Sequence, residues 1–288
     1  SLPILPDATV SFVPLIAGLS IVGIIYGALV ALSQSDWKRL VAYSSVSHMG
    51  LVMLGMFALT PVGITGSIVQ QINHGISTGA LFLIVGIVYE RRHTREISEY
   101  GGLSKTMPVY AAVFLIMTMS SIGLPTLNGF IGEILILQGI FVVSKWWAAV
   151  AATGIVLGAA YMLWLYQRTM FGTIDNPKNE GLADLNVREL ATFVPLIILA
   201  VWIGLYPSPF LRRLETSVER VMTRVNADYA PQNVMAVCQD DPSHAEVRLA
   251  KESERVDGVV AEACPDDKLT SEPSNGSMLR GSALAGGN

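Results

Sequence analysis

Charged side chains are scarce in this sequence of 288 residues. They make up 15% of the chain, whereas soluble chains average about 25%. Cysteine is scarcer still, because the chain has 2, Cys238 and Cys264, and both lie in its C-terminal tail. The charges fall in clusters, and the apolar runs between them have about 20 residues, which is long enough to cross a bilayer. This pattern excludes a soluble globular enzyme, a nucleic-acid binder and a disulfide scaffold.

Motifs of catalysis and cofactor binding are also missing. The sequence has no H-E-x-x-H zinc motif, no G-x-S-x-G nucleophile motif and no cysteine in its membrane part. A Gly-rich phosphate loop, a flavin motif and a cysteine cluster for an iron–sulfur centre are absent as well. We therefore expect no redox centre, no cofactor and no metal in this chain.

The beginning of the chain lacks an initiator methionine, since residue 1 is Ser1. It also lacks the positively charged segment, short apolar core and cleavage site of a signal peptide. No signal peptide is predicted, and we expect the front of a larger protein to be missing.

Six long apolar runs are what the sequence does have. Glycine and proline inside them are no objection, because membrane helices carry more of both. We predict an all-α polytopic membrane protein with about six transmembrane helices, one of them broken. The runs cover residues 9–34, 40–60, 64–89, 106–144, 146–167 and 190–206.

The fourth run is too long for one straight crossing. As an unbroken helix, residues 108–143 would extend roughly 54 Å, whereas the hydrocarbon core is about 30 Å thick. Its middle, IGLPTLNGFIGE, concentrates the helix breakers Gly123, Pro125, Asn128, Gly129 and Gly132. We predict two half-helices, about 108–123 and 131–143, with a hinge of irregular backbone between them. Broken helices of this kind mark ion sites in transporters.

The segments after the last run differ in character from the membrane part, residues 1–206. Apolar residues recur at three- and four-residue steps in 207–229, which predicts an amphipathic helix. Residues 230–288 hold 5 Lys and Arg against 10 Asp and Glu, and we expect an acidic, disordered tail. If that tail lies in an oxidising compartment, Cys238 and Cys264 can pair.

The positions of lysine and arginine predict the orientation of the helices. Loops 35–39, 90–107 and 168–189 receive nine such residues, and the other side receives five. This bias places those three loops in the cytoplasm, so the tail lies on the periplasmic or intermembrane side. The nine are Lys38, Arg39, Arg91, Arg92, Arg95, Lys105, Arg168, Lys178 and Arg188, and the five are Lys145, Arg212, Arg213, Arg220 and Arg224.

Three ionisable side chains lie well inside the predicted spans: His48, His74 and Glu133. An ionisable residue in a membrane is a functional hypothesis, and histidine exchanges protons near neutral pH. Each could instead make a structural hydrogen bond between helices. For Glu133, burial disfavours the charged form, whereas the positive end of a half-helix favours it. A carboxyl under opposing influences is suited to a proton relay. A metal site of two histidines and one carboxylate is the alternative.

Polar residues accompany these three at helical spacing. They form stripes that can hold water or bridge neighbouring helices, so we treat them as possible members of a proton path. Lys38 is either a membrane-edge anchor or a charge at the mouth of that path. The other candidates are Ser44, Ser47, Gln70, Gln71 and Ser77, alongside Ser67 and Thr78.

Three stretches resemble one family. They are DWKRLVAYSSVSHMG at 36–50, QQINHGISTGALFLIVGIVYERRHTREISEYGGL at 70–103 and LPTLNGFIGEILIL at 124–137. In order and spacing they are similar to the antiporter-like subunits of respiratory complex I, the proton-pumping NADH:quinone oxidoreductase. Within that family the chain resembles the M-type subunit, the counterpart of mitochondrial NADH dehydrogenase subunit four. The reason is Glu133, because L-type and N-type relatives carry lysine in the matching broken helix.

The resemblance implies a fold of two inverted five-helix repeats. Residues 9–168 match the second repeat and 190–206 the last helix, while the first repeat is absent from this sequence. The resemblance also implies that the residues matching His48 and His74 belong to a polar chain across the membrane centre. Glu133 would end that chain and govern proton exit.

The implied function is proton translocation within complex I, in a bacterial plasma membrane or the mitochondrial inner membrane. L-type and N-type neighbours and the lipid bilayer would be the partners. NADH, FMN, iron–sulfur clusters and quinone would belong to partner subunits. A subunit of a multisubunit sodium/proton antiporter and a non-pumping scaffold remain as alternatives.

Overall fold

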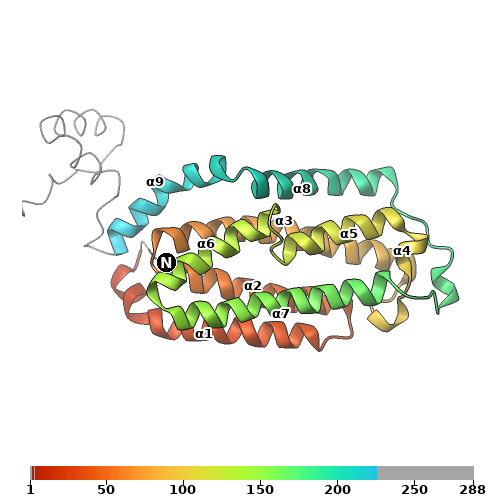
Figure 1. The fold of residues 1–288 in the computed structure, drawn as a ribbon, viewed down its shortest axis with the longest axis horizontal. Coiled ribbons are helices and arrows are strands. Elements are labelled where there is room, and N and C mark those ends of the chain that lie inside the picture. The colour runs from red at the N-terminus through yellow and green to blue at the C-terminus, as the bar shows by residue number, and fades with distance from the viewer. Residues whose placement is uncertain (1, 3, 226–288) are drawn as a thin grey trace, which may run out of the picture. The chain divides into compact units, whose positions relative to one another are not determined.

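The computed structural model describes residue 2 and residues 4–225, and the part that it describes is helical (Figure 1). The end of the predicted amphipathic segment, the acidic tail and both cysteines lie outside the described residues. The helices are α1 Pro6–Leu32, α2 Trp37–Phe57, α3 Pro61–Arg92, η1 Ile97–Glu99, α4 Leu103–Thr106, α5 Pro108–Ser121, α6 Asn128–Val143, α7 Lys145–Met170, η2 Pro177–Asn179, α8 Val187–Leu205 and α9 Ser208–Val225.

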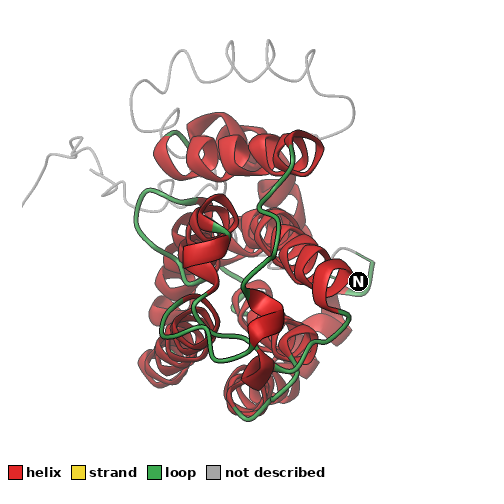
Figure 2. Ribbon diagram, turned by 90° about the vertical axis from the view of Figure 1, so that its right-hand side faces the viewer, coloured by secondary structure: helices red, strands yellow, loops and turns green. Residues whose placement is uncertain are grey.

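Helices α1, α2, α3, α7 and α8 are long and apolar enough to cross a membrane. They correspond to five of the predicted runs, and the shorter α5 and α6 together occupy the fourth. The prediction of an all-α polytopic membrane protein with one broken helix is confirmed. Viewed along the helices, the described part of the chain forms a bundle, and its longest connections follow α3 and α7 (Figure 2).

Local sequence explains where several helices begin. Asp36 accepts a hydrogen bond from the backbone N–H of Arg39 and caps α2. Thr60 caps α3 in the same way, with Pro61 at the first helical position. Asn186 and Glu189 form a reciprocal capping box at α8. Each cap satisfies backbone donors that the first turn of a helix leaves free.

The broken helix agrees closely with the prediction, and the two inner ends differ by two and three residues from the predicted 123 and 131. Helix α6 begins at Asn128, three residues earlier than expected, and α5 ends at Ser121. The two lie nearly end to end in Figure 1. Between them Gly123 has φ 73° and Thr126 has φ 88°. A β-branched residue rarely adopts a positive φ, so packing around the hinge must hold Thr126 in place.

Three loops meet at one end of the bundle. The Trp37 N–H donates to the Arg95 carbonyl at 2.9 Å, and the Gly102 N–H donates to the Phe171 carbonyl at 3.0 Å. Arg92 also donates to the Asn179 side chain at 2.7 Å. The connections after α1, α3 and α7 therefore share one side of the membrane. The short helices η1, α4 and η2 in these loops were not predicted, because turns of three or four residues leave no periodic pattern.

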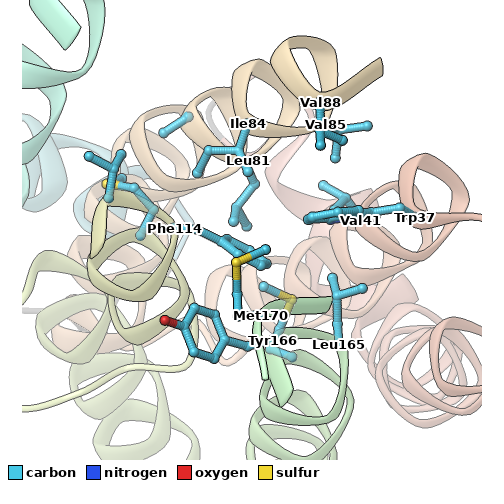
Figure 3. Packing of buried hydrophobic residues seen from close by; sticks show 14 of the residues in the cluster. Trp37, Val41, Leu81, Ile84, Val85, Val88, Phe114, Leu165, Tyr166 and Met170 are labelled. Atoms are coloured by element: carbon cyan, nitrogen blue, oxygen red, sulfur yellow. The ribbon is translucent and has the colours of Figure 1, made fainter. Parts of the chain in front are cut away.

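The largest apolar cluster lies toward that end. Trp37 and Val41 of α2 pack with Phe114 of α5 and with Tyr166 and Met170 of α7 (Figure 3). A second cluster joins α1 and α2 to α6 and α7. Helix α9 is amphipathic, as predicted: its Val218 and Met222 are buried against Ile64 of α3.

Candidate functional site: a buried row of ionisable side chains

The three ionisable residues singled out from the sequence come together where α2, α3 and α6 meet. The ring centroids of His48 and His74 are 5.6 Å apart. The Nδ1 atom of His48 lies 4.0 Å from Oε1 of Glu133, whose residue is 4% exposed. His74, His48 and Glu133 thus form a row of neighbours, in which the carboxyl is buried and the two imidazoles are partly buried.

Glu133 stands in the second turn of α6 and not at its first turn. The predicted half-helix began at residue 131, whereas α6 begins at Asn128. Because the field of a helix dipole falls off within the first turn, the helix end acts less on this carboxyl than expected. The carboxyl instead lies against Gly123 at the hinge, where an added Cβ would collide with Oε2 of Glu133. A side chain at position 123 would therefore displace the carboxyl.

The other hinge residues serve close packing. A Cβ at Gly129 would collide with the Ser120 carbonyl oxygen, and one at Gly132 would collide with the Gln70 side chain. Gly204 of α8 is placed likewise against the carbonyl oxygen of Thr126. Pro125 is exposed in the linker. The glycines thus allow α3 and α8 to pack closely against the broken helix.

A hydrogen-bonded network fastens α3 to the broken helix. The Ser77 and Ser120 hydroxyls are 2.7 Å apart, and Ser120 donates to the Asn128 side chain at 2.5 Å. Asn73 donates to the Asn128 carbonyl at 2.7 Å and to Gln70 at 3.3 Å. Gln70 and Ser77, predicted as possible path residues, hold the hinge in this network. Asn73 and Ser120 were not predicted, since single polar residues in apolar runs gave no spacing signal.

The remaining candidates are placed in different surroundings. The Ser44 hydroxyl donates to the Val41 carbonyl at 2.7 Å, and the Ser47 hydroxyl donates to the Ile24 carbonyl at 2.8 Å. Lys38 is exposed in the first turn of α2, ten residues before His48, or about 15 Å along the helix. Gln71 is exposed on α3, away from the buried face.

A small cavity adjoins the row. It has a volume of about 10 Å³, and its polar walls come from Ser47, His48, Ser121, Glu133 and Tyr161. Tyr161 of α7 was not predicted, because a tyrosine in an apolar run resembles a core residue. Its hydroxyl, a polar group inside an apolar run, was the one signal in the sequence that could have identified it. Within residue 2 and residues 4–225, no group of three His, Cys, Asp or Glu side chains is arranged to hold a metal ion.

The broken helix carries a carboxyl, and two imidazoles from neighbouring helices form a row with that carboxyl. Such an arrangement is typical of ion-translocating membrane proteins. The family described as "NADH:quinone oxidoreductase/Mrp antiporter, TM" matches residues 2–158. The chain belongs to this family.

Named relatives point in the same direction. NADH-quinone oxidoreductase subunit M of Rhodobacter capsulatus is 45% identical over 79% of this chain and 44% of its own length. NADH-ubiquinone oxidoreductase chain 4 of Marchantia polymorpha is 45% identical over 77% of this chain and 45% of its own. A chain of respiratory complex I from Thermus thermophilus, solved with bound NADH, matches with a TM-score of 0.71 at 36% identity, over 77% of this chain and 46% of that one. The chain spans somewhat less than half the length of these relatives.

Proposed function

We propose that this chain is a proton-translocating membrane subunit of an NADH:quinone oxidoreductase. The observation that carries the proposal is the row of His74, His48 and Glu133, with a 5.6 Å separation of the imidazoles and a 4.0 Å approach to the carboxyl. The named relatives support the same assignment. Other subunits would oxidise NADH and reduce quinone, and this chain would move protons in response.

Each member of the row has a distinct role in this proposal. His74 and His48 pass a proton along the membrane centre, since imidazole both accepts and donates. Glu133 receives it and releases it when a neighbouring charge changes. Thr78, whose hydroxyl is 3.1 Å from Nδ1 of His74, orients that ring. Lys38 stands at the mouth of the path, and Ser44 and Ser47 contribute to its polar surroundings, whereas the exposed Gln71 has no part in it.

The proposed setting follows the relatives. The partners are L-type and N-type membrane subunits and the lipid of a bacterial plasma membrane or mitochondrial inner membrane. FMN, iron–sulfur clusters and quinone belong to the partner subunits. The proposed division of the chain is a transmembrane part at 1–206, an amphipathic helix at 207–229 and an acidic tail at 230–288, the tail lying on the periplasmic or intermembrane side.

The test replaces Glu133 in the assembled complex. Glu133→Gln keeps the shape of the side chain but cannot ionise, and Glu133→Ala removes the carboxyl. We expect both variants to lower NADH oxidation and proton pumping together, by about 10-fold or more if the carboxyl is an obligatory relay. Both rates are measured in the same membranes, relative to the amount of assembled complex. Near-normal rates in both variants would contradict the relay.

The same membranes separate this function from sodium/proton exchange, which the family also includes. An antiporter subunit would lose sodium-driven proton movement on Glu133→Gln while NADH oxidation stayed normal. A scaffold would lose neither activity.

A further inference from the structure

Tyr161 is a fully buried side chain with an unpartnered hydroxyl. Its residue is 0% exposed, and its hydroxyl has no hydrogen-bond partner in the part of the chain that the structure describes. Leaving a buried polar group unsatisfied is unfavourable, so such a group in a native structure calls for an explanation. The usual explanation is a bound water molecule or a functional role.

Other buried tyrosines in the bundle differ from Tyr161. The Tyr110 hydroxyl donates to the Ile84 carbonyl at 2.9 Å, and the Tyr166 hydroxyl donates to the Ala111 carbonyl at 3.2 Å. Both fasten α5 to a neighbouring helix. The Tyr161 hydroxyl makes no such bond, although α7 holds its ring just as firmly in the core. Tyr110 therefore provides a matched comparison.

The hydroxyl shares its cavity with the proton row. His48 and Glu133 line the same space, and Nε2 of His48 likewise has no hydrogen-bond partner among the described residues. The Ser44 side chain lies close enough to the hydroxyl to act on it as a hydrogen-bonding group, and the carboxyl of Glu133 acts on it through its charge. Ser44 makes no hydrogen bond to it within the described chain, and the Ser44 hydroxyl donates to the Val41 carbonyl instead.

The space is suited to water. A site of roughly 10–15 Å³ with two to four polar partners holds one water molecule, and the cavity measures about 10 Å³. Gly158 lines it as well, and a Cβ there would take up part of the space, in ordinary contact at 3.7 Å from the Tyr161 hydroxyl. A phenol both donates and accepts, so one water can join it to a carboxyl and an imidazole.

Building on the proposed function, we propose that Tyr161 is a positioning residue of the proton row. Its hydroxyl orders a water molecule that bridges His48 and Glu133 across their 4.0 Å separation. The protonated imidazole of His48 gives its proton to the water while the water gives one of its own to the Glu133 carboxylate, which leaves a neutral imidazole, a water molecule and a carboxylic acid. Tyr161 itself keeps its proton throughout, so no net charge appears on α7.

The experiment compares Tyr161→Phe with Tyr110→Phe and Glu133→Gln in the assembled complex. We expect Tyr161→Phe to slow coupled NADH oxidation about two- to tenfold, as loss of one hydrogen bond to a transition state would. The solvent deuterium isotope effect should rise in this variant, because proton transfer becomes more limiting. Tyr110→Phe should leave the isotope effect unchanged even if it lowers assembly. A second variant, Gly158→Ala, fills the space beside the hydroxyl without altering it and should slow turnover likewise.

The outcomes are distinct. Normal rates and isotope effects in Tyr161→Phe and Gly158→Ala, with Glu133→Gln inactive, would overturn this inference and leave the proposed function standing. The same losses in Tyr161→Phe and Tyr110→Phe, with unchanged isotope effects, would make Tyr161 a packing residue and also overturn it. Normal rates in Glu133→Gln would overturn the proposed function itself. If Tyr161→Phe fails to assemble, Gly158→Ala decides.

Discussion

At the residue scale, the row shows how three helices share one chemical task. His48, His74 and Glu133 come from α2, α3 and α6, so no two of them are close in sequence. The sequence singled them out because ionisable groups are rare in membrane spans. Their mutual contact depends on helix packing, which the sequence alone does not reveal. Tyr161 was not predicted for a related reason: only the fold reveals that its hydroxyl lacks a partner within residue 2 and residues 4–225.

The contact between the imidazoles leads to a prediction about non-additivity. If both histidines serve one path, the first substitution already interrupts it. The double variant His48→Ala with His74→Ala should then be much less damaging than the product of the two single losses. Proton pumping per assembled complex provides the measurement. Multiplicative losses would show two independent structural contacts instead.

At the element scale, the break between α5 and α6 is the central feature. Gly123, Pro125 and Gly129 made the break predictable, since they disfavour a continuous helix. The sequence predicts the start of α6 three residues too late, because asparagine at position 128 disfavours a helix. In the structure the Asn128 side chain accepts from Ser120, and its carbonyl accepts from Asn73. Tertiary hydrogen bonds thus override the weak helix propensity of asparagine.

The other end of α5 is held from outside. Asp184 accepts hydrogen bonds from the backbone N–H groups of Val109 at 2.8 Å and Tyr110 at 3.0 Å. We predict that Asp184→Ala frays this end, at a cost of about 1–2 kcal/mol. The apparent melting temperature of the solubilised complex should fall. Asp175→Ala is the control, because the exposed Asp175 accepts a hydrogen bond from its neighbour Thr173 and caps no helix among the described residues. Equal melting temperatures would contradict the capping role.

At the scale of the whole molecule, the sequence was most informative. Apolar runs predicted the membrane helices, because hydrophobic length alone decides whether a helix can span. The meeting of three loops at one end agrees with their assignment to one common side, and the cytoplasmic placement of that side stays a prediction. The way the loops interlock was not predictable, since it rests on pairs such as Arg91 with Glu189, 2.8 Å apart. Such pairs join segments far apart in the chain.

This arrangement predicts a labelling pattern. Lys38, Lys105 and Lys178 are exposed at the end where the loops meet, and Lys145 is exposed at the start of α7, at the opposite end of that helix. Single cysteines at these positions, with Cys238 and Cys264 replaced by serine, are treated with a membrane-impermeant thiol reagent. We expect the first three to react from the cytoplasmic side and position 145 from the other side. A shared response of position 145 and any of the three would contradict the topology.

Gly204 carries a consequence for how sequence variation in this protein should be interpreted. It lies in α8, much of whose surface faces outward. Judged by hydrophobicity alone, alanine or valine at this position would be harmless. Yet a Cβ at this position meets the carbonyl oxygen of Thr126, in the linker that leads into the half-helix bearing Glu133. A change in an outward helix would thus be transmitted to the carboxyl through the hinge. A substitution at such a site would be conservative in its chemistry and disruptive in its geometry.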